Sequence, residues 1–227
     1  TFFGKNPGEQ QTVIGALKCG IVGRKSWLEK SRNLDVFDIK SDTIRTLVEL
    51  GIKEGDLHVS DKTKDCYHPG RSGSINLKSK NGPHLAYFGE LHPAIVSYLD
   101  LKEKNVFGLE IYLKNIPKPN KKIRISRESY TVSDFQKSER DFAFVIDKSF
   151  KVGDLELLIK QIDINTIKKV VTFDIFQGHN IPEGKKSVAI NVTIQAFDKT
   201  LAEKDLDAIS NKIIETVKEK TGATIRS

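Results

Sequence analysis

The chain has 227 residues, of which 38% are hydrophobic and 30% charged, and it carries a formal net charge of +7. This balance excludes a disordered tail and allows one large globular domain or two ordinary ones. No stretch approaches the roughly 18 consecutive apolar residues that span a bilayer, and the first residues do not resemble a signal peptide.

The residues up to position 116 predict an antiparallel sheet with helices packed on it, an α+β domain. The strands that we expect here cover residues 13–22, 34–39, 74–77, 85–88 and 106–113. A short helix is expected from Trp27, and a longer one after the second strand, with Ser41 or Asp42 as its N-cap. A turn at residues 81–83 makes a hairpin of the third and fourth strands.

Residues 117–132 are expected to be a linker, because Pro117 and Pro119 lie in a basic, apolar-poor run. The domain after it, residues 133–227, has a sharper pattern. Its predicted strands cover residues 140–147, 167–176, 186–196 and 223–226. Its predicted helices cover residues 152–162 and a segment that opens with a capping box at residues 200–203 and ends at Gly222. The order βαββαβ is that of a ferredoxin-like fold.

A ferredoxin-like fold places both helices on one side of the sheet, so the other side stays open. Alternation predicts which side chains share this open face: Ala143, Thr172, Asp174, Phe176, Ser187, Ala189, Asn191, Thr193 and Gln195. A face of small polar residues with one aromatic ring can stack a nucleic-acid base, or it can be an ordinary solvated surface.

Basic residues beside this face have two readings. Arg140 is either a phosphate contact or one half of a structural ion pair, and Lys185 and Lys186 are either phosphate contacts or solvated loop lysines. Lys168 and Lys169 point to opposite faces of their strand, so at most Lys168 is expected to join the open face.

No catalytic constellation or metal-ligand spacing is present. The segments at His68 and His92 favour structural turns, since each histidine is followed by proline and has no ligand pair nearby. Cys19 and Cys66 form no disulfide framework, so we expect reduced thiols, a cytoplasmic protein and no membrane partner.

Three motifs in the second domain carry a family resemblance. Residues 138–145 read SERDFAFV, residues 173–178 read FDIFQG and residues 181–187 read IPEGKKS. In this order and spacing they resemble the ferredoxin-fold anticodon-binding domain that closes the beta subunit of bacterial phenylalanyl-tRNA synthetases.

Three upstream motifs resemble the same subunit's catalytic-like domain, which has a class II synthetase fold without the active site. They read VFDIK at residues 36–40, HPGRS at 68–72 and FGELHP at 88–93. The resemblance covers nearly the whole chain. It implies a fragment without the subunit's N-terminal portion, which holds a tRNA-editing domain and a magnesium-associated module, and the absence of methionine fits a fragment.

The resemblance also assigns roles to side chains. Asp174 and Phe176 match the family's F-D-x-[YF] strand, whose ring stacks on an anticodon base and whose carboxylate accepts from a base edge. Phe176 stands where the family often has Tyr, which removes a hydroxyl hydrogen bond, and Gln136 stands where Pro is usual. The complete set of expected tRNA-binding residues is Asp174, Phe176, Arg140, Lys168, Lys185, Lys186, Ser187 and Asn191.

The resemblance implies a non-catalytic part of an ATP- and magnesium-dependent ligase. The fragment would bind the anticodon region of tRNA for phenylalanine and scaffold the catalytic alpha subunit, in a heterotetramer of two alpha and two beta subunits. It is expected to hold no cofactor or metal itself. The alternative is a stand-alone ferredoxin-like module that binds RNA or a small ligand and regulates without catalysis.

Overall fold

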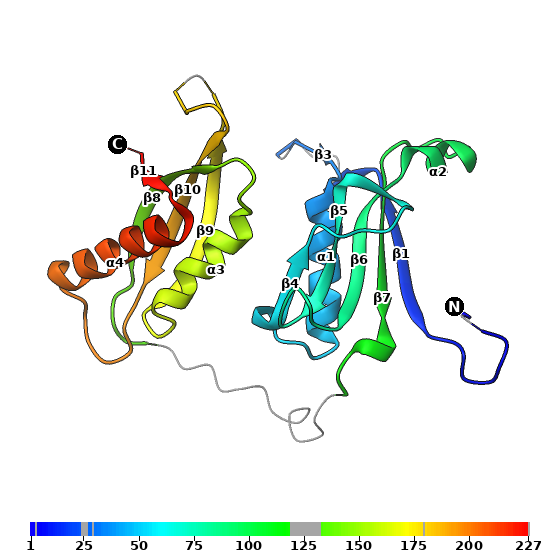
Figure 1. The fold of residues 1–227 in the computed structure, drawn as a ribbon, viewed down its shortest axis with the longest axis horizontal. Coiled ribbons are helices and arrows are strands. Elements are labelled where there is room, and N and C mark those ends of the chain that lie inside the picture. Colours follow the sequence, from blue (N-terminus) through cyan, green and yellow to red (C-terminus); the bar gives the residue numbers. More distant parts are fainter. Residues whose placement is uncertain (3, 24–26, 29, 119–132, 179, 227) are drawn as a thin grey trace. The chain divides into compact units, whose positions relative to one another are not determined.

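The computed structural model describes residues 1–227 except 3, 24–26, 29, 119–132, 179 and 227 (Figure 1). The chain forms two compact units, Thr1–Arg127 and Glu128–Ser227. None of the helices in the described residues is long and apolar enough to cross a bilayer. The linker expected at residues 117–132 lies outside the described residues except for Pro117 and Lys118, so it stays a prediction.

The first unit contains a five-stranded antiparallel sheet in the order β1-β7-β6-β5-β4 and a two-stranded ribbon, β2-β3. Its strands are β1 (Val13–Cys19), β2 (Ile21–Val22), β3 (Arg32–Asn33), β4 (Leu57–Ser60), β5 (Tyr67–Leu77), β6 (His84–Leu91) and β7 (Val106–Tyr112). Its helices are α1 (Val36–Glu49), α2 (Pro93–Tyr98) and the 3-10 turns η1 (Glu54–Asp56) and η2 (Leu113–Asn115). The long helix α1 packs on the sheet through a buried cluster that includes Leu47, Ile75 and Ile111.

The start of α1 corrects the strand predicted at residues 34–39. The helix begins at Val36, because Asp35 is its N-cap: the Asp35 carboxylate accepts from the backbone N–H of Phe37 at 2.8 Å, and the Asp38 carboxylate accepts from that of Asp35 at 2.9 Å. This reciprocal capping outweighs the alternating apolar pattern of the short segment. The helix expected from Trp27 is also wrong, since the ring is 95% exposed and lies outside any helix.

Other predictions for the first unit are confirmed. The strands at residues 74–77, 85–88 and 106–113 lie within or along β5, β6 and β7, while 13–22 is divided at Gly20 into β1 and β2. The hairpin turn needs Gly82, because a Cβ there would lie 1.8 Å from the Leu77 carbonyl oxygen. The predicted structural turns are present as well: the Gly70 N–H donates to His68 Nδ1 at 3.0 Å, and His92 caps α2.

The second unit has the order βαββαβ, as predicted. Its elements are β8 (Ser138–Asp147), α3 (Val152–Ile162), β9 (Ile167–Phe176), β10 (Lys185–Ile194), α4 (Glu203–Thr221) and β11 (Thr224–Ile225). The strands form an antiparallel sheet in the order β11-β8-β10-β9, so β9 is an edge strand. The predicted capping box at residues 200–203 is displaced: α4 begins at Glu203, and the Asp205 carboxylate accepts from the Ala202 N–H at 3.1 Å. Gly222 ends α4 with a φ of 67°.

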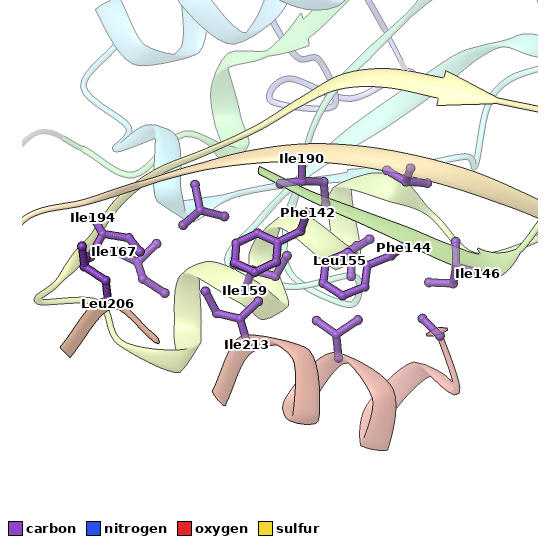
Figure 2. Close-up of a cluster of buried hydrophobic side chains, with 14 residues drawn as sticks. Phe142, Phe144, Ile146, Leu155, Ile159, Ile167, Ile190, Ile194, Leu206 and Ile213 are labelled. Carbon is purple, nitrogen blue, oxygen red and sulfur yellow. The ribbon is translucent and has the colours of Figure 1, made fainter. Parts of the chain in front are cut away.

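The core of this unit lies between the sheet and its two helices (Figure 2). Phe142, Phe144 and Ile146 of β8 point toward Leu155 and Ile159 of α3 and toward α4, as alternation predicts. The remaining buried members of the cluster are Ile167, Val188, Ile190, Val192, Ile194, Leu206, Ile213, Val217 and Ala223. Both helices therefore cover one face of the sheet, and the described residues of this unit place no helix on the other face.

Candidate nucleic-acid interface

The helix-free side of the second sheet, which we call the open face, is built from side chains that pair across three strands. Ala189 of β10 lies between Ala143 of β8 and Asp174 of β9, and Ser187 lies between Val145 and Phe176. The prediction that Asp174 and Phe176 share a face with the small residues of β10 is confirmed. The centre of the open face is therefore a floor of small side chains with an acid and an aromatic ring at one side.

One member predicted for the open face is on the other side. The pairing of β9 with β10 shifts between Asp174–Ala189 and Thr172–Ile190, so Phe173 is an extra, bulged residue. Thr172 therefore faces the helices, where its hydroxyl is buried and finds no partner among the described residues. Val171 takes its place on the open face, opposite Asn191.

Phe176 has a defined position on the open face. Its ring is 41% exposed, and it lies against Gly178, where a Cβ would come within 2.5 Å of the ring's Cζ. The guanidinium carbon of Arg226 lies 5.5 Å from the ring centre. Because β8 and β10 separate β9 from the C-terminal strand, this contact crosses the open face above the small residues. The guanidinium lies over the ring in a cation–π contact, and both groups are of the kind on which nucleic-acid bases stack.

Asp174 provides the complementary hydrogen-bonding group. Its side chain is exposed, and its carboxylate makes no hydrogen bond or ion pair with the described residues. An ionised carboxylate only accepts hydrogen bonds, so it selects a partner that presents N–H groups, such as the edge of a base, over a phosphate. Together, Asp174, Phe176 and Arg226 offer an acceptor, a stacking surface and a donor around one shallow floor.

Three further residues expected to bind tRNA also lie on the open face. The Asn191 amide donates to the carboxylate of Asp141 at 2.7 Å, so it is held by its cross-strand partner. Ser187, directly opposite Phe176, is almost fully buried. Lys185, at the end of β10, follows the same alternation and pairs with Asp147.

Arg140 and Lys186 lie on the helix-covered side instead. Arg140 forms an ion pair with Glu203 at the start of α4, at 2.5 Å. This contact supports the interpretation of Arg140 as one half of a structural ion pair. The Lys186 ammonium donates to the carbonyl oxygens of Lys148 and Phe150 at 3.0 and 2.6 Å, and burial lowers the pKa of Lys186. Both cations have partners within the fold.

The two lysines of β9 do not lie on the faces that simple alternation predicts. Lys169 pairs with Thr193 and so lies on the open face, whereas Lys168 falls at a second register shift of β9. The Lys168 ammonium lies 3.7 Å from the centre of the Phe197 ring. The prediction that Lys169 points away from the open face is therefore wrong, because a second bulge interrupts the alternation.

The first unit carries a charged cluster on its sheet. Lys64 lies 2.5 Å from Glu110 and 5.0 Å from the centre of the Tyr87 ring, and the Tyr112 hydroxyl donates to Glu110 at 2.9 Å. Burial alone would lower the pKa of Lys64, but its hydrogen bonds to Glu110 and Tyr112 outweigh burial and raise it. The described residues contain no group of three or more side chains arranged to hold a metal ion. The charges of this cluster are satisfied internally.

Sequence reasoning missed Arg226 as a member of the candidate site. The signal was present, because Arg226 follows the short strand β11 two residues after Thr224, which pairs with Val145 of the open face. The backbone N–H of Arg226 donates to the Ala143 carbonyl at 2.8 Å, which extends this pairing by one step.

Each of the two units matches a known protein domain family. Residues 133–226 match the ferredoxin-fold anticodon binding domain, and residues 1–113 match the phenylalanyl tRNA synthetase beta chain CLM domain. Similar curated proteins are phenylalanine–tRNA ligase beta subunits. Those of Rhodospirillum rubrum and Bartonella henselae are 36% and 37% identical, over 100% and 97% of this chain. That of Rickettsia prowazekii is 35% identical over 96% of the chain.

The chain spans only 26–28% of the length of these relatives. The two domain matches follow each other in the order in which the two compact units occur, and together they cover nearly the whole chain. The chain therefore belongs to the phenylalanine–tRNA ligase beta-subunit family, of which it represents the CLM and anticodon-binding domains.

Proposed function

We propose that this chain binds the anticodon region of tRNA for phenylalanine through the open face of its second unit. The observation that carries the proposal is the arrangement of Phe176, Asp174 and Arg226 around a floor of small residues. A base would stack on the Phe176 ring while its edge N–H groups donate to Asp174. Lys185 and Lys169 would add phosphate contacts at the border of the face.

The first unit would scaffold the catalytic alpha subunit, in an assembly of two alpha and two beta subunits in the cytoplasm. We propose that its sheet has the class II synthetase-like architecture without an active site, which the CLM match and the internally satisfied Lys64–Glu110 cluster support. ATP and magnesium would then act in the alpha subunit. ATP–pyrophosphate exchange by the isolated chain would contradict the assignment of catalysis to the alpha subunit.

A stand-alone regulatory module that binds RNA or a small ligand is the other reading of a ferredoxin-like fold. It leaves the match of residues 1–113 to a synthetase beta-chain domain unexplained. A role as part of a phenylalanine–tRNA ligase beta subunit accounts for both units.

The test is a titration of the chain with tRNA for phenylalanine and with the same tRNA carrying a replaced anticodon, at two salt concentrations. We expect a preference for the cognate anticodon that persists at the higher salt, because base contacts depend less on counterion release than phosphate contacts do. Equal binding that fades with salt for both tRNAs would contradict the proposal.

Replacement of Phe176 by alanine should weaken cognate binding by about 1–3 kcal/mol, the usual contribution of one stacked base. Phe197→Ala is a matched control, since Phe197 is a similarly exposed aromatic residue in the turn after β10. Unchanged affinity of Phe176→Ala at fixed salt would exclude stacking on this ring.

A further inference from the structure

The orientation of Asp174 and Phe176 depends on the bulge in β9. Before the bulge, Lys169 and Val171 pair with Thr193 and Asn191 and lie on the open face. Without an extra residue, alternation would bring Phe173 and Ile175 to that face and turn Asp174 and Phe176 toward the helices. The extra residue at Phe173 reverses the alternation for the rest of the strand.

Hydrophobic burial does not select this register. Phe173, Ile175 and Phe176 remain 59%, 48% and 41% exposed, so the apolar side chains on either side of the strand end gain little burial. The strand also lies at the edge of the sheet, where only β10 pairs with it. Polar contacts of the strand's backbone are the remaining interactions that can hold the shift.

Glu156 of α3 makes such an interaction. Its Oε1 accepts from the backbone N–H of Thr172 at 2.9 Å, one residue before the bulged Phe173. The neighbouring Leu155 and the Ile159 one turn later are fully buried, so the helix is anchored at this position. The carboxylate thus satisfies an edge-strand donor at the point where the pairing shifts.

We propose that Glu156 is a positioning residue for anticodon recognition: it holds the bulge at Phe173 and thereby keeps Asp174 and Phe176 on the open face. The proposal rests on the proposed function of that face. Glu156 itself contacts no RNA; it acts through the register of β9.

The test compares Glu156→Ala and Glu156→Gln in the full 227-residue chain. Glu215→Ala, an exposed glutamate of α4, is the control for the loss of one negative charge. Two quantities are measured: the hydrogen-exchange rate of the Thr172 amide without RNA, and the ratio of affinities for cognate and anticodon-replaced tRNA at one salt concentration.

In Glu156→Ala we expect Thr172 exchange to accelerate roughly tenfold or more, the scale of a lost hydrogen bond to a charged group. The cognate preference should fall, while the affinity for the replaced anticodon changes no more than in Glu215→Ala. Glu156→Gln should behave like the unmodified chain, since its amide oxygen still accepts from Thr172.

The proposal would be overturned if Glu156→Ala kept both the Thr172 exchange rate and the cognate preference of the unmodified chain. It would also be overturned if Glu215→Ala lost the preference for cognate tRNA to the same extent. An unmodified chain without any anticodon preference would instead overturn the proposed function, and with it the positioning role. That outcome is distinguishable, because Thr172 exchange would still respond to Glu156→Ala.

Discussion

Replacement of Gly178 by alanine tests whether the position of the Phe176 ring matters for RNA binding. A Cβ at residue 178 would lie 2.5 Å from the ring's Cζ and 3.0 Å from its Cε1. Carbon atoms in ordinary contact are about 3.5 Å apart, so the ring must withdraw by about 1 Å. Gly178 does not have a positive φ, so its backbone accepts alanine and only the ring has to move.

The expected cost follows from the loss of contact. A gap of this size removes roughly a quarter to a half of a dispersion contact, and one stacked base contributes about 1–3 kcal/mol. Cognate tRNA should therefore bind about 0.3–1.5 kcal/mol more weakly, roughly a 2- to 12-fold loss. The free energy of unfolding should change by only about 0.5 kcal/mol, because the displaced ring is exposed.

The assay is the same tRNA titration at fixed salt, accompanied by urea unfolding. Gly153→Ala on α3 is the matched control, because a Cβ there meets nothing within 4 Å. A folded Gly178→Ala variant that binds cognate tRNA as tightly as the unmodified chain would refute the argument. An effect larger than that of Phe176→Ala would also refute it, since displacement cannot cost more than removal of the ring.

Three further outcomes follow from the contacts described above. Lys186→Met should reduce the free energy of unfolding, measured in urea, by about 1–3 kcal/mol, because two carbonyls lose their donor. Lys185→Met is the control and should not reduce it, since Lys185 lies on the open face at the start of the same strand. Ile213→Ala should cost about 2–5 kcal/mol in the same assay, since this side chain is fully buried beneath the sheet, and a smaller cost would mean a loosely packed core. In Asp38, hydrogen bonds from Arg32 and the Asp35 N–H lower the carboxyl pKa from 3.8 to about 2. The unfolded chain therefore takes up this proton first, and the stabilisation present above about pH 4 should be lost as the pH falls toward about 2. Protection factors of the α1 amides should differ between Asp38→Asn and the unmodified chain at pH 7 and converge near pH 2; a constant difference would exclude the ionised carboxylate as the cause.

The sequence predicts the second unit better than the first, for a physical reason. Long, regular patterns such as residues 152–162 and 186–196 repeat their period several times, so the helix and the strand are distinguishable. The segment 34–39 is too short for that: its apolar residues fit either period, and the Asp35–Asp38 capping interaction decides in favour of a helix.

The candidate site could be predicted in part. The order and faces of β8 and β10 follow from alternation. The expected orientation of Asp174 and Phe176 is also right, but only because the register shift at Lys168 and the bulge at Phe173 offset each other. A bulge leaves no recognisable mark in the pattern of apolar and polar residues, however. Strict alternation therefore placed Thr172 on the wrong face. The contact between Arg226 and Phe176 joins residues at opposite edges of the sheet and depends on strand order, which local patterns do not encode.

The two register shifts of β9 have a consequence for the behaviour of the chain at high concentration. An edge strand with a regular row of free N–H and C=O groups is a template on which another molecule's strand can add. In β9 the bulges interrupt that row, and Glu156 occupies the Thr172 N–H. The exposed Phe173 and Ile175 therefore lie on a strand whose backbone does not offer a continuous partner surface. The same irregularity that orients two side chains also protects a partly apolar edge against aggregation.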